Sequence, residues 1–499
     1  MNITSPRIVI ALVAALGVTA GAQQNNEEFA RRQFDSGMSF LQNHRYTEAL
    51  KDLQAVVDSF ATSSVSDNAL LQIAQYQLEV AHDLDASQGA VDKLLKEYPD
   101  TDSAPMAHVL AGRIAMTKGR TPADLDAALA SFERVPRLFP GNEAVAAAGF
   151  FAGEALRSFR RDADALERYR RVTMEYPRST WAARASLSAG YCLVQQEKPA
   201  QALQEFQRAR RLMPNSPAAT EALNLNSIAY RLYIRNPAQP AFAFTNKLIG
   251  PEKSELRDAT GILFDAAGQL MLGHKGGVTT FKADGSIAQS YGAVDATAFF
   301  VDEQDRIVVA RNGMLVTARA DSIAFMGPGS GSDTQLRAVD EIPAVLPNEK
   351  GERLISNVKQ RNVIRSLPNG KFVSVFAQGQ VSRMARNWLG DVAMIDRSNK
   401  SIMVADRDGK VISRLPQKGT GYELDEPQDV AFDALGHLYV LERGKGSILV
   451  FGVKNKLITT LTIPNNAPGS LTRGEALGID AAGRLYVFDE KSRRIQVYQ

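Results

Sequence analysis

The sequence predicts a multidomain chain in which an all-α helical solenoid precedes an all-β six-bladed propeller. Two periodicities predict this, one in each half of the 499 residues. In the first half, a proline follows a bulky residue at intervals of 41, 37 and 37 positions. In the second half, an Asp or Asn stands three residues before a Gly in a phrase that recurs at intervals of 37, 46, 39, 46 and 47 positions. The intervals in the second half are typical of the blades of a propeller.

The N-terminus has the pattern of a secretory signal over residues 1–22. Arg7 supplies a positive charge, residues 8–19 form an apolar run, and Ala20-Gly21-Ala22 is a small-x-small cleavage site. The apolar run of 12 residues is too short to span a bilayer. We therefore expect cleavage after Ala22 and a periplasmic or secreted protein.

Residues 25–235 are predicted to form pairs of antiparallel helices. An alanine precedes three of the prolines by 12 positions and an aromatic residue precedes them by 8. Small residues let two helices approach closely, and a proline stops the second helix of each pair. The four bulky residue–proline pairs are Tyr98-Pro99, Phe139-Pro140, Tyr176-Pro177 and Met213-Pro214.

This pattern resembles the tetratricopeptide repeat (TPR), with about five copies and a capping helix over residues 217–235. In such repeats the first helices line a concave groove, and residues just after the small glycine face inward. A groove of mixed charge with an aromatic residue suits an extended peptide of a partner. A solvated helix face explains the same residues without a function. The groove candidates are Arg113, Glu154, Arg157 and Tyr191.

A proline-containing hinge at residues 236–240 leads into the predicted propeller, residues 241–499. In each repeat the Asp caps the backbone and the Gly tolerates positive φ, so the phrase predicts a turn between two strands. Apolar runs around it predict four antiparallel strands per blade. The six copies begin at Asp265, Asp302, Asn348, Asn387, Asp433 and Asp480, and only the second lacks the glycine, which Asp305 replaces.

The last blade is one strand short, because the chain ends after the run 494–498. Residues 246–249 repeat residues 455–458, the start of the outer strand of blade five. We therefore expect residues 245–249 to complete blade six, which leaves no open sheet edge. The alternative is a chance tetrapeptide in a linker.

The phrases 426–440 and 483–498 resemble the NHL repeat. The resemblance covers about residues 240–499 and implies a six-bladed propeller. It implies little about chemistry, because this fold hosts both binding proteins and enzymes.

Composition excludes several functions. A net charge of +3 is too small to indicate nucleic-acid binding, and none of the common catalytic or phosphate-binding motifs is present. The single cysteine, Cys192, cannot form an internal disulfide and is expected to be a buried apolar residue. We predict no cofactor and no bound metal.

Polar residues at the ends of the second strands are expected to share one face of the ring near its axis. We interpret them as a binding face, and solvated loops are the alternative. The loops that enter the first strands are expected to reach the same face with Asp258, Asp295, Asp429 and Glu475. Together these carboxylates could also hold a divalent cation, as in lactonase-type propellers. The candidates are His274, Arg311, Asp396, Glu442 and Asp489.

The resulting hypothesis is a secreted or periplasmic interaction scaffold. It would bind partner proteins or peptides of the cell envelope through the helical groove and the propeller face, without nucleic acid and without a membrane span. The alternative is a propeller hydrolase or lyase that uses a divalent metal at the axial face.

Overall fold

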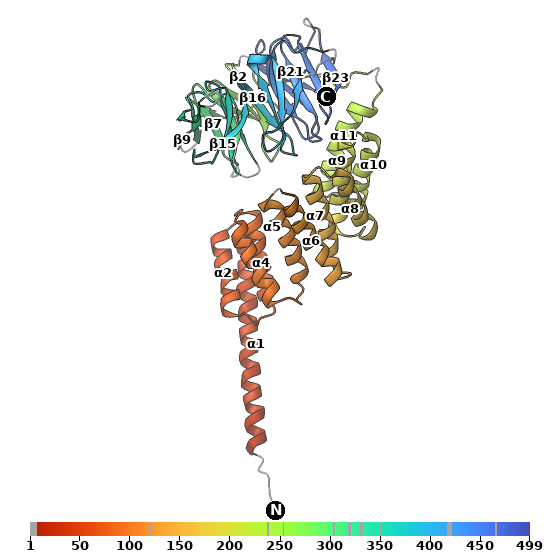
Figure 1. Ribbon diagram of the computed structural model, residues 1–499, viewed down its shortest axis with the longest axis vertical. Coiled ribbons are helices and arrows are strands. Elements are labelled where there is room, and N and C mark those ends of the chain that lie inside the picture. Colours follow the sequence, from red (N-terminus) through yellow and green to blue (C-terminus); the bar gives the residue numbers. More distant parts are fainter. Residues whose placement is uncertain are drawn as a thin grey trace, which may run out of the picture. The chain divides into compact units, whose positions relative to one another are not determined.

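The predicted fold class is confirmed by a computed structural model, in which helices precede six four-stranded sheets (Figure 1). The chain divides into two compact units, Met1–Cys192 and Leu193–Gln499. The structure describes residues 7–499 apart from residues 120, 237–238, 253, 303–304, 318–320, 330–332, 349–350, 417–421 and 465–466.

The first unit is a series of helical hairpins in chain order. Within each hairpin two helices pack side by side, and neighbouring hairpins contact each other through α2 and α3, α4 and α5, and α6 and α7. The helices are α1 (Arg7–Gln42), α2 (Tyr46–Ser59), α3 (Ser66–Glu79), α4 (Leu84–Glu97), α5 (Ala104–Lys118), α6 (Pro122–Leu138), α7 (Ala144–Ser158), α8 (Asp162–Glu175) and α9 (Thr180–Gln195), the last of which continues past Cys192 into the second unit.

Small residues allow the close packing that the sequence predicts. A Cβ atom on Gly153 would overlap the ring of Tyr169, and one on Gly112 would overlap the ring of Phe132. The second helices α4, α6 and α8 each end just before the bulky residue of a bulky residue–proline pair. Cys192 is fully buried, as expected, and burial raises the pKa of its thiol.

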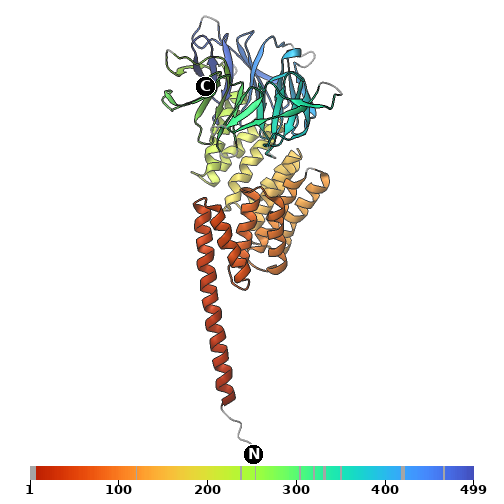
Figure 2. The same ribbon diagram turned by 90° about the vertical axis from the view of Figure 1, so that its left-hand side faces the viewer.

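Helix α1 is one continuous helix of 36 residues that extends past its neighbours (Figure 2). It includes residues 7–22 of the predicted signal, whereas residues 1–6 lie outside the described residues. Among the residues that the structure describes, no helix is both long and apolar enough to cross a membrane. Cleavage after Ala22 and the cellular location stay predictions.

The second unit contains a six-bladed β-propeller. Each blade is a four-stranded antiparallel sheet, and the innermost strands contact one another in chain order around the ring. The strands of blades one to three are β2 (Ala259–Phe264), β3 (Leu270–His274), β4 (Gly277–Phe281), β5 (Ile287–Gly292), β6 (Ala298–Val301), β7 (Ile307–Arg311), β8 (Met314–Thr317), β9 (Ser322–Ala324), β12 (Val345–Pro347), β13 (Arg353–Asn357), β14 (Asn362–Ser366) and β15 (Phe372–Gln378).

Blades four to six follow the same plan. A separate hairpin of two short strands, β10 and β11, stands between blades two and three. The remaining strands are β10 (Met326–Pro328), β11 (Leu336–Ala338), β16 (Val381–Arg386), β17 (Val392–Asp396), β18 (Ser401–Ala405), β19 (Val411–Leu415), β20 (Pro427–Phe432), β21 (Leu438–Glu442), β22 (Ser447–Phe451), β23 (Leu457–Thr462), β24 (Gly474–Ile479), β25 (Leu485–Asp489), β26 (Arg494–Tyr498) and β1 (Phe244–Ile249).

The repeated phrase forms the same turn in all six blades. The side-chain Oδ1 of its first residue accepts a hydrogen bond from the backbone N–H four positions ahead, over 2.7–3.0 Å. The fourth residue has positive φ in every copy, including Asp305 at +55°. Asp is one of the few residues other than Gly that tolerates this conformation, so the second copy keeps the turn.

Ring closure is confirmed. Strand β1 pairs antiparallel with β26, with Phe244 opposite Tyr498 and Ile249 opposite Ile495. Ala243 and Gln499 extend this pairing by exchanging two backbone hydrogen bonds of 3.0 Å. Blade six is therefore completed by residues from the beginning of the propeller.

Two further helices and a π-helix belong to the second unit: α10 (Pro199–Leu212), α11 (Pro217–Ala229) and η1 (Tyr230–Ile234). The Tyr233 hydroxyl lies 2.8 Å from His437 Nε2 of blade five. Arg231 donates a hydrogen bond to the Gly483 carbonyl of blade six over 2.5 Å. Leu232 packs against the hydrophobic core that contains Phe242 and Tyr439.

These contacts bear on the predicted hinge. Leu232 packs against a core of blades five and six, although it precedes the hinge at 236–240. Residues 237 and 238 of that hinge lie outside the described part of the chain. The boundaries at 235 and 241 stay predictions.

Candidate functional site

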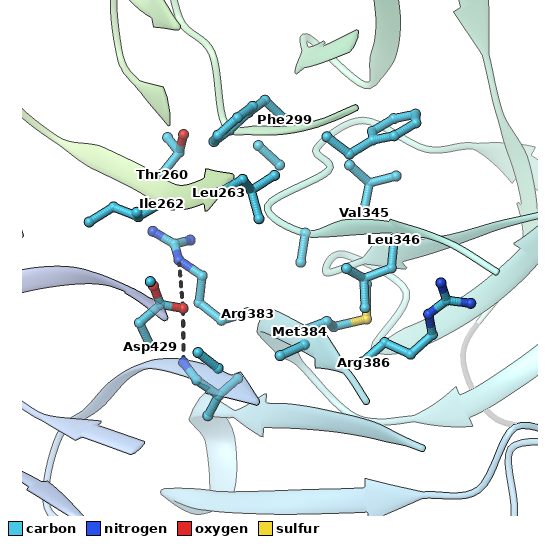
Figure 3. Close-up of a pocket in the computed structure, with 18 of the residues that line it drawn as sticks. Thr260, Ile262, Leu263, Phe299, Val345, Leu346, Arg383, Met384, Arg386 and Asp429 are labelled. Carbon is cyan, nitrogen blue, oxygen red and sulfur yellow. Dashed lines mark hydrogen bonds and ion pairs between the residues drawn. The ribbon is translucent and has the colours of Figure 1, made fainter. Parts of the chain in front are cut away.

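The propeller encloses a cavity of about 430 Å³ on its axis (Figure 3). Residues from all six innermost strands line it. Each of these strands is the edge of its sheet, so one row of its backbone N–H and C=O groups has no strand partner. The cavity is therefore surrounded by backbone hydrogen-bonding groups as well as by side chains.

Arg383 lines one end of this cavity. It lies on β16 of blade four, and its guanidinium Nη2 donates to the Ala259 carbonyl of blade one over 3.0 Å. Blades one and four are opposite each other in a ring of six, so this side chain crosses the axis. Nη1 donates to the carbonyl of Ser382 over 3.2 Å, whereas Nε makes no hydrogen bond within the described residues. The side chain is only 13% exposed, and burial lowers its pKa.

Asp429 of blade five is the acidic neighbour of this guanidinium. Its Oδ1 lies 3.9 Å from Arg383 Nε, and the two carboxylate oxygens accept the backbone N–H groups of Val430 and Leu477 over 2.9 and 2.8 Å. Burial raises the pKa of Asp429 to about 6. Together with Glu475, whose carboxylate accepts the Ala259 N–H over 2.9 Å, these groups join blades one, four, five and six.

The rest of the cavity wall is mainly apolar. The charged residues that line the cavity are Arg383, Arg386 and Asp429. At the end away from Arg383, the last residues of the inner strands are half-buried, whereas the first residues at the Arg383 end are buried. The apolar lining at the half-buried end includes Phe264, Leu346, Phe432 and Ile479.

The sequence analysis missed Arg383. In the strand pairing of blades one, four, five and six, Gly261, Arg383, Asp429 and Ala476 occupy equivalent positions just after a β-bulge. At this repeat position, blades four and five have an Arg and an Asp, whereas blades one and six have small residues. This difference between adjacent repeats is a sequence signal from which the site could have been predicted.

The residues of the predicted propeller face lie at the end of the ring where the inner strands begin. In the strand pairing, His274, Asp396, Glu442 and Asp489 lie opposite the first residue of the innermost strand of their blade. Arg311 follows the residue in that position, Ala310. His274 Nε2 lies 3.0 Å from the Thr279 hydroxyl, and burial lowers the His274 pKa. Arg311 is half-buried at the end of β7.

The three carboxylates of this face are buried and serve their own blades. Asp396 Oδ1 accepts the Ser398 N–H over 3.1 Å, and Asp489 Oδ2 accepts the Ser492 N–H over 2.9 Å. The Glu442 carboxylate accepts the N–H groups of Asp425 and Glu426 over 3.1 and 2.6 Å. These side chains hold turns and loops, and their binding role stays a prediction.

The alternative hypothesis places a divalent cation at the carboxylates of this face. Across the described chain, no three His, Cys, Asp or Glu side chains gather as metal ligands. Both carboxylate oxygens of Glu442 accept backbone N–H groups, whereas Asp396 and Asp489 each accept one at a single oxygen.

We expect Asp489→Ala to lower the free energy of unfolding by about 1 kcal/mol, the value of one buried hydrogen bond. The loss should be the same with a chelator and with added calcium, because the carboxylate stabilises a turn. Thermal unfolding of the wild type and the variant under both conditions measures this. A drop of several degrees caused by chelator in the wild type, and reversed by calcium, would contradict it.

Three of the four groove candidates come together in the first unit. Glu154 accepts hydrogen bonds from Arg157 over 2.5 Å, from the Tyr169 hydroxyl over 2.6 Å and from the Ser188 hydroxyl over 2.8 Å. The Arg157 guanidinium lies 5.7 Å from the Tyr191 ring centre. This polar cluster connects α7, α8 and α9, and only part of it reaches the surface.

Arg113 belongs to a separate row of side chains that crosses α5, α7 and α9. It pairs with Glu79 over 2.6 Å and lies 4.6 Å above the ring of Phe151. The Phe151 and Trp181 rings meet edge to face at 5.0 Å, and Arg184 lies 5.2 Å from the Trp181 ring. We call these four residues, Arg113, Phe151, Trp181 and Arg184, the arginine–aromatic row.

The sequence analysis identified only Arg113 of this row. The available signal was Trp181, one of two tryptophans in the chain, near the start of a first helix. Phe151 and Trp181 are half-buried and Arg184 is exposed, so the row is part of the protein surface.

No protein-family model matches the chain. No curated protein matches it either. Among solved structures, 52% of the chain is similar to 97% of a streptogramin B lyase, with 9% identity and a TM-score of 0.38. A catalytically inactive virginiamycin B lyase from Staphylococcus aureus with quinupristin is similar over 52% of this chain and 99% of its own, with 9% identity and a TM-score of 0.36. A gluconolactonase from Xanthomonas campestris is similar over 48% of this chain and 86% of its own, with 16% identity and a TM-score of 0.38. At these identities the similarity concerns the fold alone.

Proposed function

We propose that this protein is an interaction scaffold of the bacterial envelope or exterior that binds an extended segment of a partner protein on its helical unit. The arginine–aromatic row is the observation that carries the proposal. It crosses three successive first helices, α5, α7 and α9, and its exposed surface combines flat rings with guanidinium groups.

Aromatic and arginine side chains contribute most of the binding energy in many interfaces. Here the rings of Phe151 and Trp181 are held by each other and by the neighbouring arginines, so little side-chain entropy is lost when a partner binds. The exposed guanidinium of Arg184 favours a partner segment with acidic residues beside apolar ones.

The first 22 residues support a location outside the cytoplasm, since they carry the pattern of a cleaved signal. The propeller would serve as a second binding module, because its predicted face and its axial cavity lie on a separate compact unit.

Selection of a random peptide library against the full-length protein tests the proposal. We expect the recovered peptides to combine acidic and aromatic or aliphatic residues. Arg184→Glu should weaken their binding at least about tenfold, because the substitution reverses the charge at an exposed position of the row.

Arg171→Glu is the matched control. Arg171 is 53% exposed and lies on the second helix α8, away from the row. Equal binding to both variants and the wild type would contradict the proposal, as would selected peptides without acidic residues. Unchanged melting temperatures would confirm that both variants are folded.

A further inference from the structure

We propose that the outer face of α11 and η1 is a docking surface for one amphipathic helix of a partner protein. Four side chains form this surface, which we call the α11 stripe: Leu223, Ser227, Tyr230 and Ile234. The inference goes beyond the peptide binding proposed above and does not depend on it, because the arginine–aromatic row lies in the first unit and the α11 stripe lies in the second.

The α11 stripe is an exposed and mainly apolar side of a helix. Its members follow one another at intervals of three or four residues, so they share one side of the helix. Leu223 is 47% exposed, Tyr230 54% and Ile234 43%. The Ser227 hydroxyl donates to the Leu223 carbonyl of its own helix over 3.0 Å, so this small side chain does not need a polar partner from outside.

The other sides of α11 are covered. Helix α10 packs along it, and an added Cβ atom on Gly483 of blade six would lie 2.6 Å from the Ile228 side chain. Ala222, Leu225 and Ala229 of the same helix are buried. The α11 stripe is therefore the side of this helix that the described part of the chain leaves open to solvent.

The helical repeat indicates what would cover this side. Gly153 and Leu156 of α7 stand two repeat lengths before Ser227 and Tyr230. There the second helix α8 packs on α7, since an added Cβ atom on Gly153 would overlap the Tyr169 ring, and Leu156 is only 3% exposed. From α11 the described chain continues into η1 and β1 without another helix. The last helical hairpin thus has a first helix and an open place for a second one.

The earlier second helices define the kind of helix that fits this place. Each of α6, α8 and α10 has an alanine four residues before an aromatic residue, and all six side chains are buried: Ala128 and Phe132, Ala165 and Tyr169, Ala202 and Phe206. A partner helix with the same spacing can place its aromatic ring over the small Ser227, between Leu223 and Tyr230. Amphipathic helices bind partner surfaces through such anchors on one face.

The apolar character of the α11 stripe distinguishes it from an ordinary end of a helical array. Terminal repeats of such arrays have a polar outer face, which keeps the array soluble. A contiguous exposed apolar patch instead marks an interaction site. Burial of apolar surface under a partner helix contributes about 25 cal/mol per Å², so the three large side chains of the stripe favour association.

Selection of a library of helix-constrained peptides against the full-length protein tests the inference. We expect the recovered peptides to have one apolar face with an aromatic residue four positions after a small one, and to bind with a dissociation constant below about 100 μM. Leu223→Asp should weaken their binding at least about tenfold, because it places a charge in an apolar interface. Ser227→Trp should have the same effect, because it fills the place of the partner's aromatic ring.

Met174→Asp is the matched control, since Met174 is 71% exposed on α8 of the first unit. This variant should bind the selected peptides as the wild type does. Arg184→Glu should do so too, because it alters only the arginine–aromatic row. Failure to recover any peptide, or recovered peptides whose binding Leu223→Asp leaves unchanged, would overturn the inference. A wild-type dimer that Leu223→Asp separates in analytical ultracentrifugation would also overturn it, since a second copy would then cover the α11 stripe.

Discussion

Removal of residues 494–499 should unfold the propeller. These residues form β26, which lies between β25 and β1 in blade six, so their loss separates the two ends of the ring. Ile495, Val497 and Tyr498 are each at most 3% exposed. Burial of a large apolar side chain contributes about 1.5–3 kcal/mol, and the total of three approaches the whole stability of a typical domain, about 5–15 kcal/mol.

Circular dichroism and thermal unfolding of the shortened chain measure this result. We expect the helical signal of the first unit to persist and the cooperative β-sheet transition to be lost. Removal of Gln499 alone is the control, because that residue is exposed and contributes only its backbone pairing with Ala243. A chain ending at Arg493 that unfolds like the full-length protein would contradict the structural importance of closure.

Asp433→Ala should lower the free energy of unfolding by at least about 3 kcal/mol, since each buried donor left without a partner costs about 1–3 kcal/mol. Asp433 accepts the N–H groups of Leu435 and His437 over 2.9 and 3.0 Å. Its second oxygen lies 2.7 Å from His437 Nδ1 and accepts the Tyr439 hydroxyl over 3.0 Å. Because His437 also meets Tyr233, the substitution should loosen the attachment of η1 to blade five.

Asp265→Ala is the matched control, because Asp265 is the first residue of the same phrase in blade one. Its side chain accepts only the Gln269 N–H, over 2.7 Å, among the described residues, and it is partly exposed. Chemical denaturation of both variants should give a cost of about 1 kcal/mol for Asp265→Ala. Equal losses in the two variants would show that the buried network around His437 adds nothing to the turn.

The sequence was sufficient to predict the turns, the blades and the closure. Asp265 and Gly268 form their turn through contacts within five residues, so the local sequence alone specifies it. The helix ends before Pro99, Pro140 and Pro177 are local in the same way, since proline acts on the preceding turn of its own helix. Closure of the ring could be predicted from the sequence repeat, because residues 246–249 repeat the start of the outer strand of blade five.

The candidate site, in contrast, depends on the tertiary structure. Arg383 and Ala259 are 124 positions apart, and Tyr233 and His437 are 204 apart. The repeat pattern placed Asp396, Glu442 and Asp489 at one end of the ring, but only the folded structure reveals that each carboxylate accepts a backbone N–H group. A repeat fixes where a residue lies within its blade through local hydrogen bonds. Which side chains meet across the axis, and which of their polar atoms stay without partners, depends on the packing of all six blades.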